Sequence, residues 1–334
     1  GIKTILISGT PSHDAVSAYE LIKEMQIPYV TILTQPDIMT ARIGSQVTAD
    51  AEEITIACLP GLNRSALLTN DDMKGLPPEQ VHRIMTDKIS QLCMGMSAQM
   101  PDDKPKILMA HMTYQGADKG FTDLLMQNEP ILTREAVEGF DLVCLGHIHK
   151  PQIIDGKVFY SGPIERLSFN EQDIQPGFWI HEVALQANPV RISLPVVEYK
   201  KELNSEFIET PARRYVTLEW PEKAVQGFID GELQFSRTVV EESIVRLHYS
   251  CSEETAQQLN RKQLEQSLYD AGAFFITEIK SDIQRVDRAR DNTVNESLSV
   301  PQALEKWAVN QGIEAQEVEA LKAMAVGLLE QPSC

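Results

Sequence analysis

The most informative stretch of the sequence is Asp141–Pro151, which reads DLVCLGHIHKP. Residues 141–145 predict a buried strand, and Gly146 gives the backbone the freedom to turn at its end. His147 and His149 stand at positions i and i+2, so in an extended chain they project to the same side. Neutral imidazoles are common ligands of Mn, Fe and Zn. The pair therefore indicates a metal site, with two ordinary polar loop residues as the alternative.

Two other predicted strands also end in residues that can carry chemistry. Residues 106–112 predict a strand with His111 near its end, where a lone histidine is more often structural. Residues 3–8 predict the first strand, and His13 and Asp14 follow its turn. Asp14 suits a helix N-cap as well as catalysis, while His13 could donate a proton or stabilise charge on a phosphate. In α/β proteins, the loops that carry catalytic and binding residues commonly follow the carboxyl ends of the strands.

The first 197 residues alternate strand and helix patterns, which predicts a layered α/β domain over 1–197. The other expected strands are 29–33, 54–59, 157–160, 177–184 and 190–197, and the expected helices are 14–25, 77–96 and 133–139.

The remaining chain divides into three segments. Residues 198–212 are charged and poorly periodic, which predicts a linker. Residues 213–285 predict a small α+β domain with strands at 215–220, 244–249 and 274–280 and helices at 222–229 and 253–270. Residues 296–334 predict two helices, at 301–309 and 314–330. The second helix has an apolar stripe (Val318, Leu321, Ala325, Leu328) that so short a hairpin should not bury by itself, so we expect a partner surface, with packing onto the α+β domain as the alternative.

Composition limits the class of protein. The 334 residues are 43% hydrophobic and carry a net charge of −18. This mix excludes a mostly disordered chain and argues against a general nucleic-acid coat protein. Five widely spaced cysteines without a Cys-x-x-Cys motif predict a reducing cytoplasm, and no apolar run is long enough for a membrane span. Contact with DNA would then need local basic residues, and the candidates are Arg213, Arg214, Lys280 and Arg285, with a solvated face as the alternative.

Taken together, these segments resemble the calcineurin-like metallophosphoesterases, and among them the SbcD-type DNA repair exonucleases. The family motifs Gly-Asn-His-Asp, a strand ending in His, and Gly-His-x-His correspond to residues 9–14, to Ala110-His111 and to 146–149. The stretch Tyr160–Glu171, YSGPIERLSFNE, is similar to the segment that follows in the nucleases. Ser12 stands where the family has its metal-binding Asn.

The resemblance implies a fold and a mechanism. It implies an α/β/β/α sandwich followed by a capping domain and a C-terminal helical pair that docks on an SbcC-type coiled-coil ATPase. Two divalent metal ions, best suited to Mn, would hydrolyse phosphodiester bonds in DNA. His111 and His147 would bind one ion and His149 the other, while His13 would stabilise the transition state or leaving group and Asp14 would orient His13. Cytoplasmic location and a homodimer are further expectations.

The family's Asp-x-His and Gly-Asp motifs are missing from the chain. We therefore expect them upstream of Gly1 and expect this chain alone to be nearly inactive as a nuclease.

Two alternatives to the nuclease stay open. A non-catalytic adapter of the ATPase with a degenerate metal site is one alternative. A small-molecule phosphodiesterase is the other, although it would need neither the capping domain nor the tail.

Overall fold

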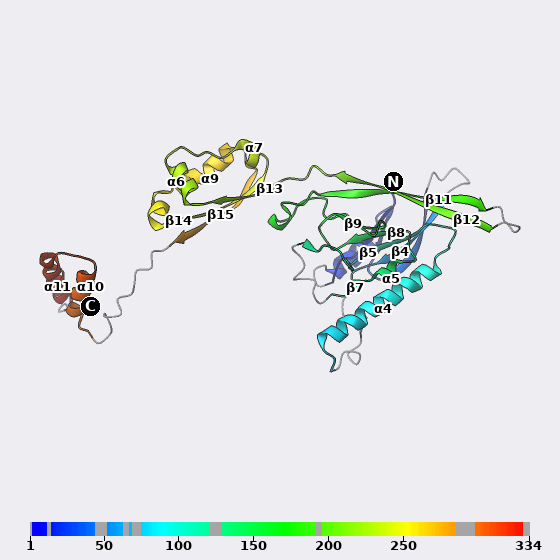
Figure 1. Ribbon diagram of the computed structural model, residues 1–334, viewed down its shortest axis with the longest axis horizontal. Helices are drawn as coiled ribbons and strands as arrows, with labels where there is room; N and C mark the ends of the chain where they lie inside the picture. Colours follow the sequence, from blue (N-terminus) through cyan, green and yellow to red (C-terminus); the bar gives the residue numbers. More distant parts are fainter. Residues whose placement is uncertain are drawn as a thin grey trace. The chain divides into compact units, whose positions relative to one another are not determined.

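The computed structural model describes residues 2–11, 15–43, 52–62, 67–68, 75–120, 129–190, 196–284 and 298–329. The chain is a mixed α/β protein with several sheets (Figure 1). It divides into two compact units: unit 1 is Gly1–Glu219, Leu233–His248 and Asn260–Lys280, and unit 2 is Trp220–Glu232, Tyr249–Leu259 and Ser281–Cys334. Among the described residues, no helix is both long and apolar enough to span a membrane.

Unit 1 is built around a six-stranded, mostly parallel sheet in the order β3-β4-β5-β8-β10-β9. The strands are β3 (Asp37–Ile43), β4 (Glu52–Leu59), β5 (Lys106–His111), β8 (Leu142–Gly146), β10 (Val158–Tyr160) and β9 (Gln152–Ile154). The four central strands run parallel, and the edge strands β3 and β9 run antiparallel to their neighbours. The predicted strands at 54–59, 106–112, 141–145 and 157–160 are therefore confirmed, whereas β3 was not predicted.

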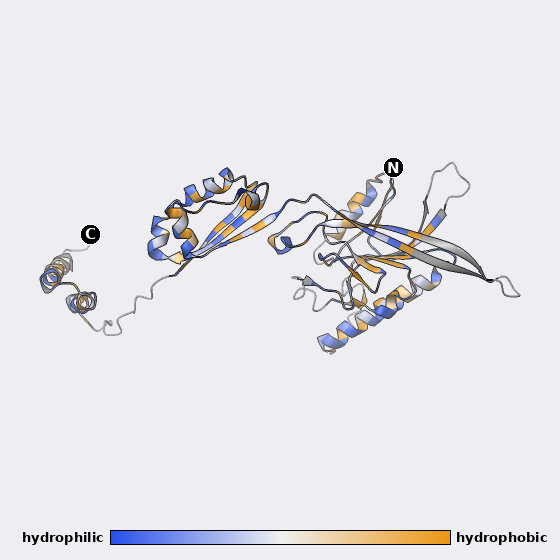
Figure 2. Cartoon of the chain, turned by 45° about the horizontal axis from the view of Figure 1, so that its top comes forward, coloured by the Kyte–Doolittle hydropathy of each residue, from blue (hydrophilic) through white to orange (hydrophobic). Residues whose placement is uncertain are grey.

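One long helix packs against this sheet. Helix α4 (Pro78–Gln99) begins with Pro78 in its first turn, where a missing N–H costs nothing, and it lies along one side of the sheet in Figure 1. Its buried residues Ile89, Cys93 and Met96 belong to the same apolar cluster as Leu108 and Val143 of the central strands. The orange strands in Figure 2 mark this core. Short elements complete the region: β6 (Thr113–Tyr114), β7 (Ile131–Leu132) and α5 (Arg134–Val137).

The N-terminal strands form a small sheet of their own. Strands β1 (Thr4–Ile7) and β2 (Val30–Leu33) pair in parallel, with α1 (Val16–Glu24) between them in sequence. The backbone beyond β1 contacts the loop after β4, because the Gly61 N–H donates to the Ser8 carbonyl at 2.9 Å. A β-carbon on Gly61 would lie 2.4 Å from the Gly9 carbonyl oxygen, so glycine is needed for this close approach.

The predicted linker at 198–212 is wrong for most of its length. Strands β11 (Gly177–Val190) and β12 (Val196–Glu209) form an antiparallel hairpin with fourteen residues in each strand. Of the expected strand at 190–197, Val190 ends β11, residues 196–197 begin β12, and residues 191–195 lie outside the described residues. Pairing along the hairpin satisfies the backbone of β12, and its described residues 203–209 are half-buried or exposed, so the strand needs no strong hydrophobic pattern. This is why its weak hydrophobic pattern was misleading.

The α+β segment has the expected strands in the order β13-β14-β15. They are β13 (Tyr215–Trp220), β14 (Ile244–Ser252) and β15 (Phe275–Gln284), with α6 (Glu222–Ile229), α7 (Arg237–Val240), α8 (Glu253–Gln258) and α9 (Arg261–Asp270). The single helix expected over 253–270 is two helices, because the Asn260 side chain accepts hydrogen bonds from the N–H groups of Lys262 and Gln263 and so starts α9 anew.

The C-terminal helices are α10 (Val300–Asn310) and α11 (Ala315–Leu329), close to their predicted bounds. Ser299 and Gln302 form a capping box at the start of α10. The hairpin buries part of the apolar stripe: Val318 is 5% exposed, and Lys322 of α11 forms an ion pair with Glu305 of α10 at 2.8 Å. The expectation that the hairpin could not bury the stripe by itself is therefore wrong for Val318.

Candidate functional site

The ends of two neighbouring parallel strands bring His111 and His147 together. In the register of β5 and β8, His111 pairs with Gly146, so His147 is the next residue beyond the paired ends. The ring centroids of His111 and His147 lie 5.0 Å apart, at an interplanar angle of 61°. The structure therefore places these two predicted ligands side by side at the carboxyl edge of the sheet.

His147 has an unusual backbone and an unusual ring environment. Its φ angle is +91°, outside the regions that L-residues ordinarily occupy. Its side chain is 9% exposed, and its Nε2 atom lies 2.6 Å from Oε2 of Glu129. The two atoms do not meet in hydrogen-bond geometry, however, and Nε2 is buried without a hydrogen bond. His82 on α4 also has a buried Nδ1 atom without a hydrogen bond, so what distinguishes His147 is its place beside His111 and its positive φ angle.

His149 has a carboxylate partner of its own. Its Nδ1 atom lies 2.5 Å from Oε1 of Glu171, a residue of the 3-10 turn η2 (Phe169–Glu171). The second carboxylate oxygen, Oε2, accepts the Leu167 N–H at 2.7 Å. Glu171 is only 2% exposed, whereas the His149 side chain is 42% exposed. A carboxylate behind the imidazole is the arrangement that commonly orients metal-binding histidines.

Two buried tyrosines fix the chain that leaves His111. The Tyr160 hydroxyl donates to the Met112 carbonyl at 2.8 Å and accepts the Tyr114 N–H at 2.7 Å. The Tyr114 hydroxyl in turn donates to Asp155. Burial, together with this carboxylate, raises the pKa of Tyr114 to about 12, so the phenol stays a donor at any ordinary pH. The backbone after His111 is thus tied to the end of β10.

The predicted metal-binding set is only partly assembled. Among the residues that the structure describes, no three His, Cys, Asp or Glu side chains form a group that could hold a metal ion. His13 and Asp14, and Ser12 before them, lie outside the described residues, although the preceding Ser8–Gly9 segment contacts the loop after β4. His111 and His147 are together, and nothing in the described geometry adds His149 to that pair.

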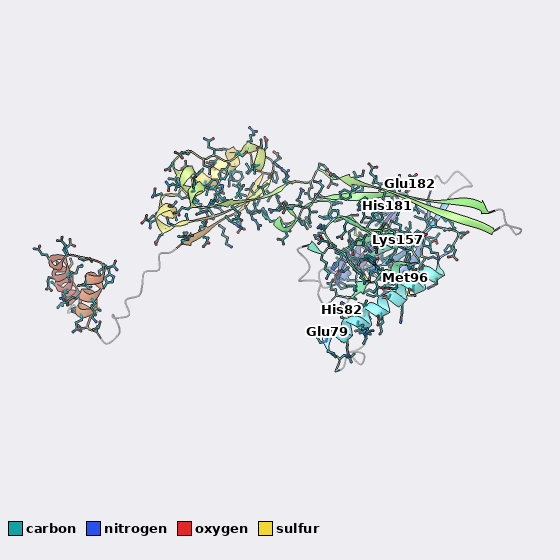
Figure 3. The ribbon with its side chains drawn as sticks, viewed as in Figure 1. Glu79, His82, Met96, Lys157, His181 and Glu182 are labelled. Atoms are coloured by element: carbon teal, nitrogen blue, oxygen red, sulfur yellow. The ribbon has the colours of Figure 1, made fainter. Side chains whose placement is uncertain are left out.

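Sequence reasoning missed two acidic residues of this region. Glu171 stands at the end of the nuclease-like stretch, which was a signal that it could be functional. Glu129 precedes Pro130 and belongs to no predicted strand or helix, so no pattern in the sequence connects it with His147. Two other histidines lie elsewhere: Figure 3 labels His82 on α4 and His181 on β11, and burial lowers the pKa of His181.

The arginines proposed for DNA contact have partners within the protein. Arg213 donates to the carbonyl and the carboxylate of Glu242, and its guanidinium carbon lies 3.6 Å from the centroid of the Phe274 ring. Arg214 donates to the carbonyls of Thr238 and Glu241. Both side chains therefore fix the turn around α7. Lys280 is exposed at the surface, and Arg285 lies outside the described residues.

The four described cysteines are free thiols, and burial raises the pKa of Cys93 and of Cys144, beside the histidine loop, to about 12. Both thiols are therefore inert packing groups.

In comparison with known proteins, no protein-family model matches the chain, and no curated protein sequence matches it significantly.

Proposed function

We propose that the chain is the nuclease subunit of an SbcD-type complex, a metal-dependent phosphodiester hydrolase that acts on DNA. The observation that carries the proposal is the pair that His111 and His147 form at the ends of the parallel strands β5 and β8. The α/β/β/α metallophosphoesterase sandwich is the fold that we propose for 1–197. A mostly parallel sheet with α4 packed against it supports that fold.

Imidazole side chains suit divalent cations, and the described residues bring two of the proposed ligands, His111 and His147, together. His111 and His147 would hold one ion and His149 the other, and mixed imidazole and oxygen ligands suit Mn. When bound, the ions would polarise the phosphodiester and lower the pKa of the attacking water. The chain's own residues orient the groups: the carboxylate of Glu171 holds the ring of His149, and the tyrosine pair fixes the backbone after His111. By resemblance, His13 would stabilise the charge that develops in the transition state or on the leaving group, and Asp14 would orient the His13 side chain.

The test is Mn-dependent cleavage of end-labelled duplex DNA by the natural full-length polypeptide. We expect His147→Ala to abolish cleavage, because a ligand is lost, and His82→Gln on α4 to keep it. Equal cleavage by the His147→Ala variant would contradict the proposal. A wild-type protein that neither binds Mn²⁺ nor cleaves DNA would favour the non-catalytic adapter.

We further propose that residues 296–334 dock on an SbcC-type ATPase in the cytoplasm. Trp307, Val309 and Met324 remain 48%, 65% and 70% exposed on the hairpin, and an apolar helical surface is a common docking element. Deleting 296–334 should abolish co-purification with the ATPase while the circular dichroism of the remaining chain keeps its folded form. Full-affinity binding by the truncated protein would contradict the docking role.

A further inference from the structure

We propose that Glu171 is a positioning residue that fixes the tautomer of His149, so that its Nε2 atom is the nitrogen presented to a metal ion. The proposal rests on the function proposed above, and it concerns a residue of the nuclease-like stretch that has no assigned role. Glu171 would touch neither the substrate nor the metal, and would act only through His149.

The first step of the argument is the burial of the carboxylate. Glu171 is 2% exposed, and each of its two oxygens faces one donor: Oε1 faces Nδ1 of His149 at 2.5 Å, and Oε2 accepts the Leu167 N–H at 2.7 Å. A buried carboxylate is costly unless its oxygens are satisfied. Because both oxygens face donors, the carboxylate is held at both ends and cannot turn away from the ring.

The second step is the proton on the ring. A carboxylate oxygen can only accept, so a neutral His149 must carry its proton on Nδ1 in order to donate to Glu171. Nε2 is then the unprotonated nitrogen, and a bond from this ring to a metal would come from that atom. The carboxylate therefore selects the tautomer that can coordinate a metal ion.

The third step is the anchoring of Glu171 from the other side. Its neighbour Phe169 packs edge-to-face on Tyr215, with ring centroids 5.0 Å apart, and the guanidinium carbon of Arg246 lies 4.3 Å from the Phe169 ring centroid. The Gln172 side chain accepts a hydrogen bond from the Thr217 hydroxyl. Turn η2 is thus bound to β13 and β14, which gives Glu171 a fixed position from which to hold the ring.

The competing explanation is that Glu171 only holds its own loop through the Leu167 N–H. The same loop offers a matched control. Glu165 also uses its carboxylate on the backbone, since its Oε1 accepts the N–H groups of Arg166 and Arg213, but it makes no described contact with His149. Glu165→Gln changes the charge of the loop by the same amount as Glu171→Gln does.

The two variants should behave differently for a specific reason. A glutamine at 171 has one acceptor oxygen for two donors. The Leu167 N–H cannot move, whereas the His149 ring can exchange its proton between nitrogens. The amide therefore donates to Nδ1, and the ring proton moves to Nε2, where it blocks coordination.

The experiment records the ¹⁵N shifts of His149 in the metal-free chain, at a pH where the ring is neutral, and then titrates Mn²⁺ by calorimetry. We expect wild type and Glu165→Gln to show the Nδ1–H tautomer, and Glu171→Gln to show Nε2–H with Mn²⁺ affinity about 10- to 100-fold lower. An unchanged tautomer in Glu171→Gln, or an equal change in Glu165→Gln, overturns the proposal. If the wild type binds no Mn²⁺, the proposed function fails, and the tautomer comparison still decides whether Glu171 positions the ring.

Discussion

A β-carbon on Gly146 would lie 3.1 Å from Nδ1 of His111, so the imidazole occupies the space that the glycine leaves. This contact joins the paired ends of β5 and β8. Glycine at this position therefore sets where the ring of His111 can lie, in addition to ending the strand.

Gly146→Ala should displace the His111 ring by a few tenths of an ångström, because a contact of this length is tighter than carbon normally allows. A ligand displaced in this way should weaken Mn²⁺ binding roughly 10-fold, by analogy with the loss of an orienting contact. Calorimetric titration of the variant and the wild type measures the effect. Unchanged affinity would show that the ring can move without consequence.

Gly95→Ala on α4 provides the control and a prediction of its own. Nothing lies within 4 Å of a β-carbon at this position, and alanine lowers the entropy cost of an interior helical residue. We expect the free energy of unfolding to rise by about 0.5–1 kcal/mol, as measured by urea denaturation, with no change in Mn²⁺ affinity. Destabilisation would mean that this part of α4 contacts something beyond the described residues.

Tyr160→Phe should destabilise unit 1, because it leaves the Met112 carbonyl and the Tyr114 N–H buried without their shared partner. Each unsatisfied group costs about 1–3 kcal/mol, so the free energy of unfolding should fall by at least about 2 kcal/mol in urea titrations. Tyr29→Phe, at a side chain that is 60% exposed, should leave it nearly unchanged. Equal effects of the two variants would exclude the hydrogen bonds as the cause.

The third prediction about stability concerns pH and His248, which lies between two carboxylates. Its Nδ1 and Nε2 atoms lie 3.1 Å from Glu219 and 3.0 Å from Glu278. The hydrogen bond to His248 is the main cause that lowers the pKa of Glu278 below its ordinary 4.5. A lowered carboxyl pKa stabilises the folded state above pH 4.5, and this contribution is lost as the pH falls through the folded-state pKa.

His248→Val should therefore raise the pKa of Glu278 toward 4.5 and shrink the acid-induced loss of stability below that pH. Carboxyl ¹³C titrations followed by NMR measure this directly. Glu222 is an internal reference, because Ser252 and Thr255, not a histidine, lower its pKa. A Glu278 titration that does not change in the variant would contradict the role of His248.

The sequence predicted the sheet edge better than it predicted the surroundings of the site. Apolar runs that end in His111 and Gly146 are local signals, and parallel pairing then brought His111 and His147 together. The strand β12 was missed because its backbone is satisfied by β11 and its hydrophobic pattern is weak. Glu129 could not be found at all, because its proximity to His147 depends on the tertiary structure and not on any local pattern.

The positive φ angle of His147 has a consequence for how this position can vary. A backbone of this kind costs about 1–3 kcal/mol for a residue with a β-carbon, and glycine would relieve that cost. Selection for thermal stability alone would therefore favour losing the histidine, while selection for what its imidazole does would favour keeping it. Random mutagenesis with two separate screens, one for heat resistance and one for activity, should thus enrich opposite residues at position 147.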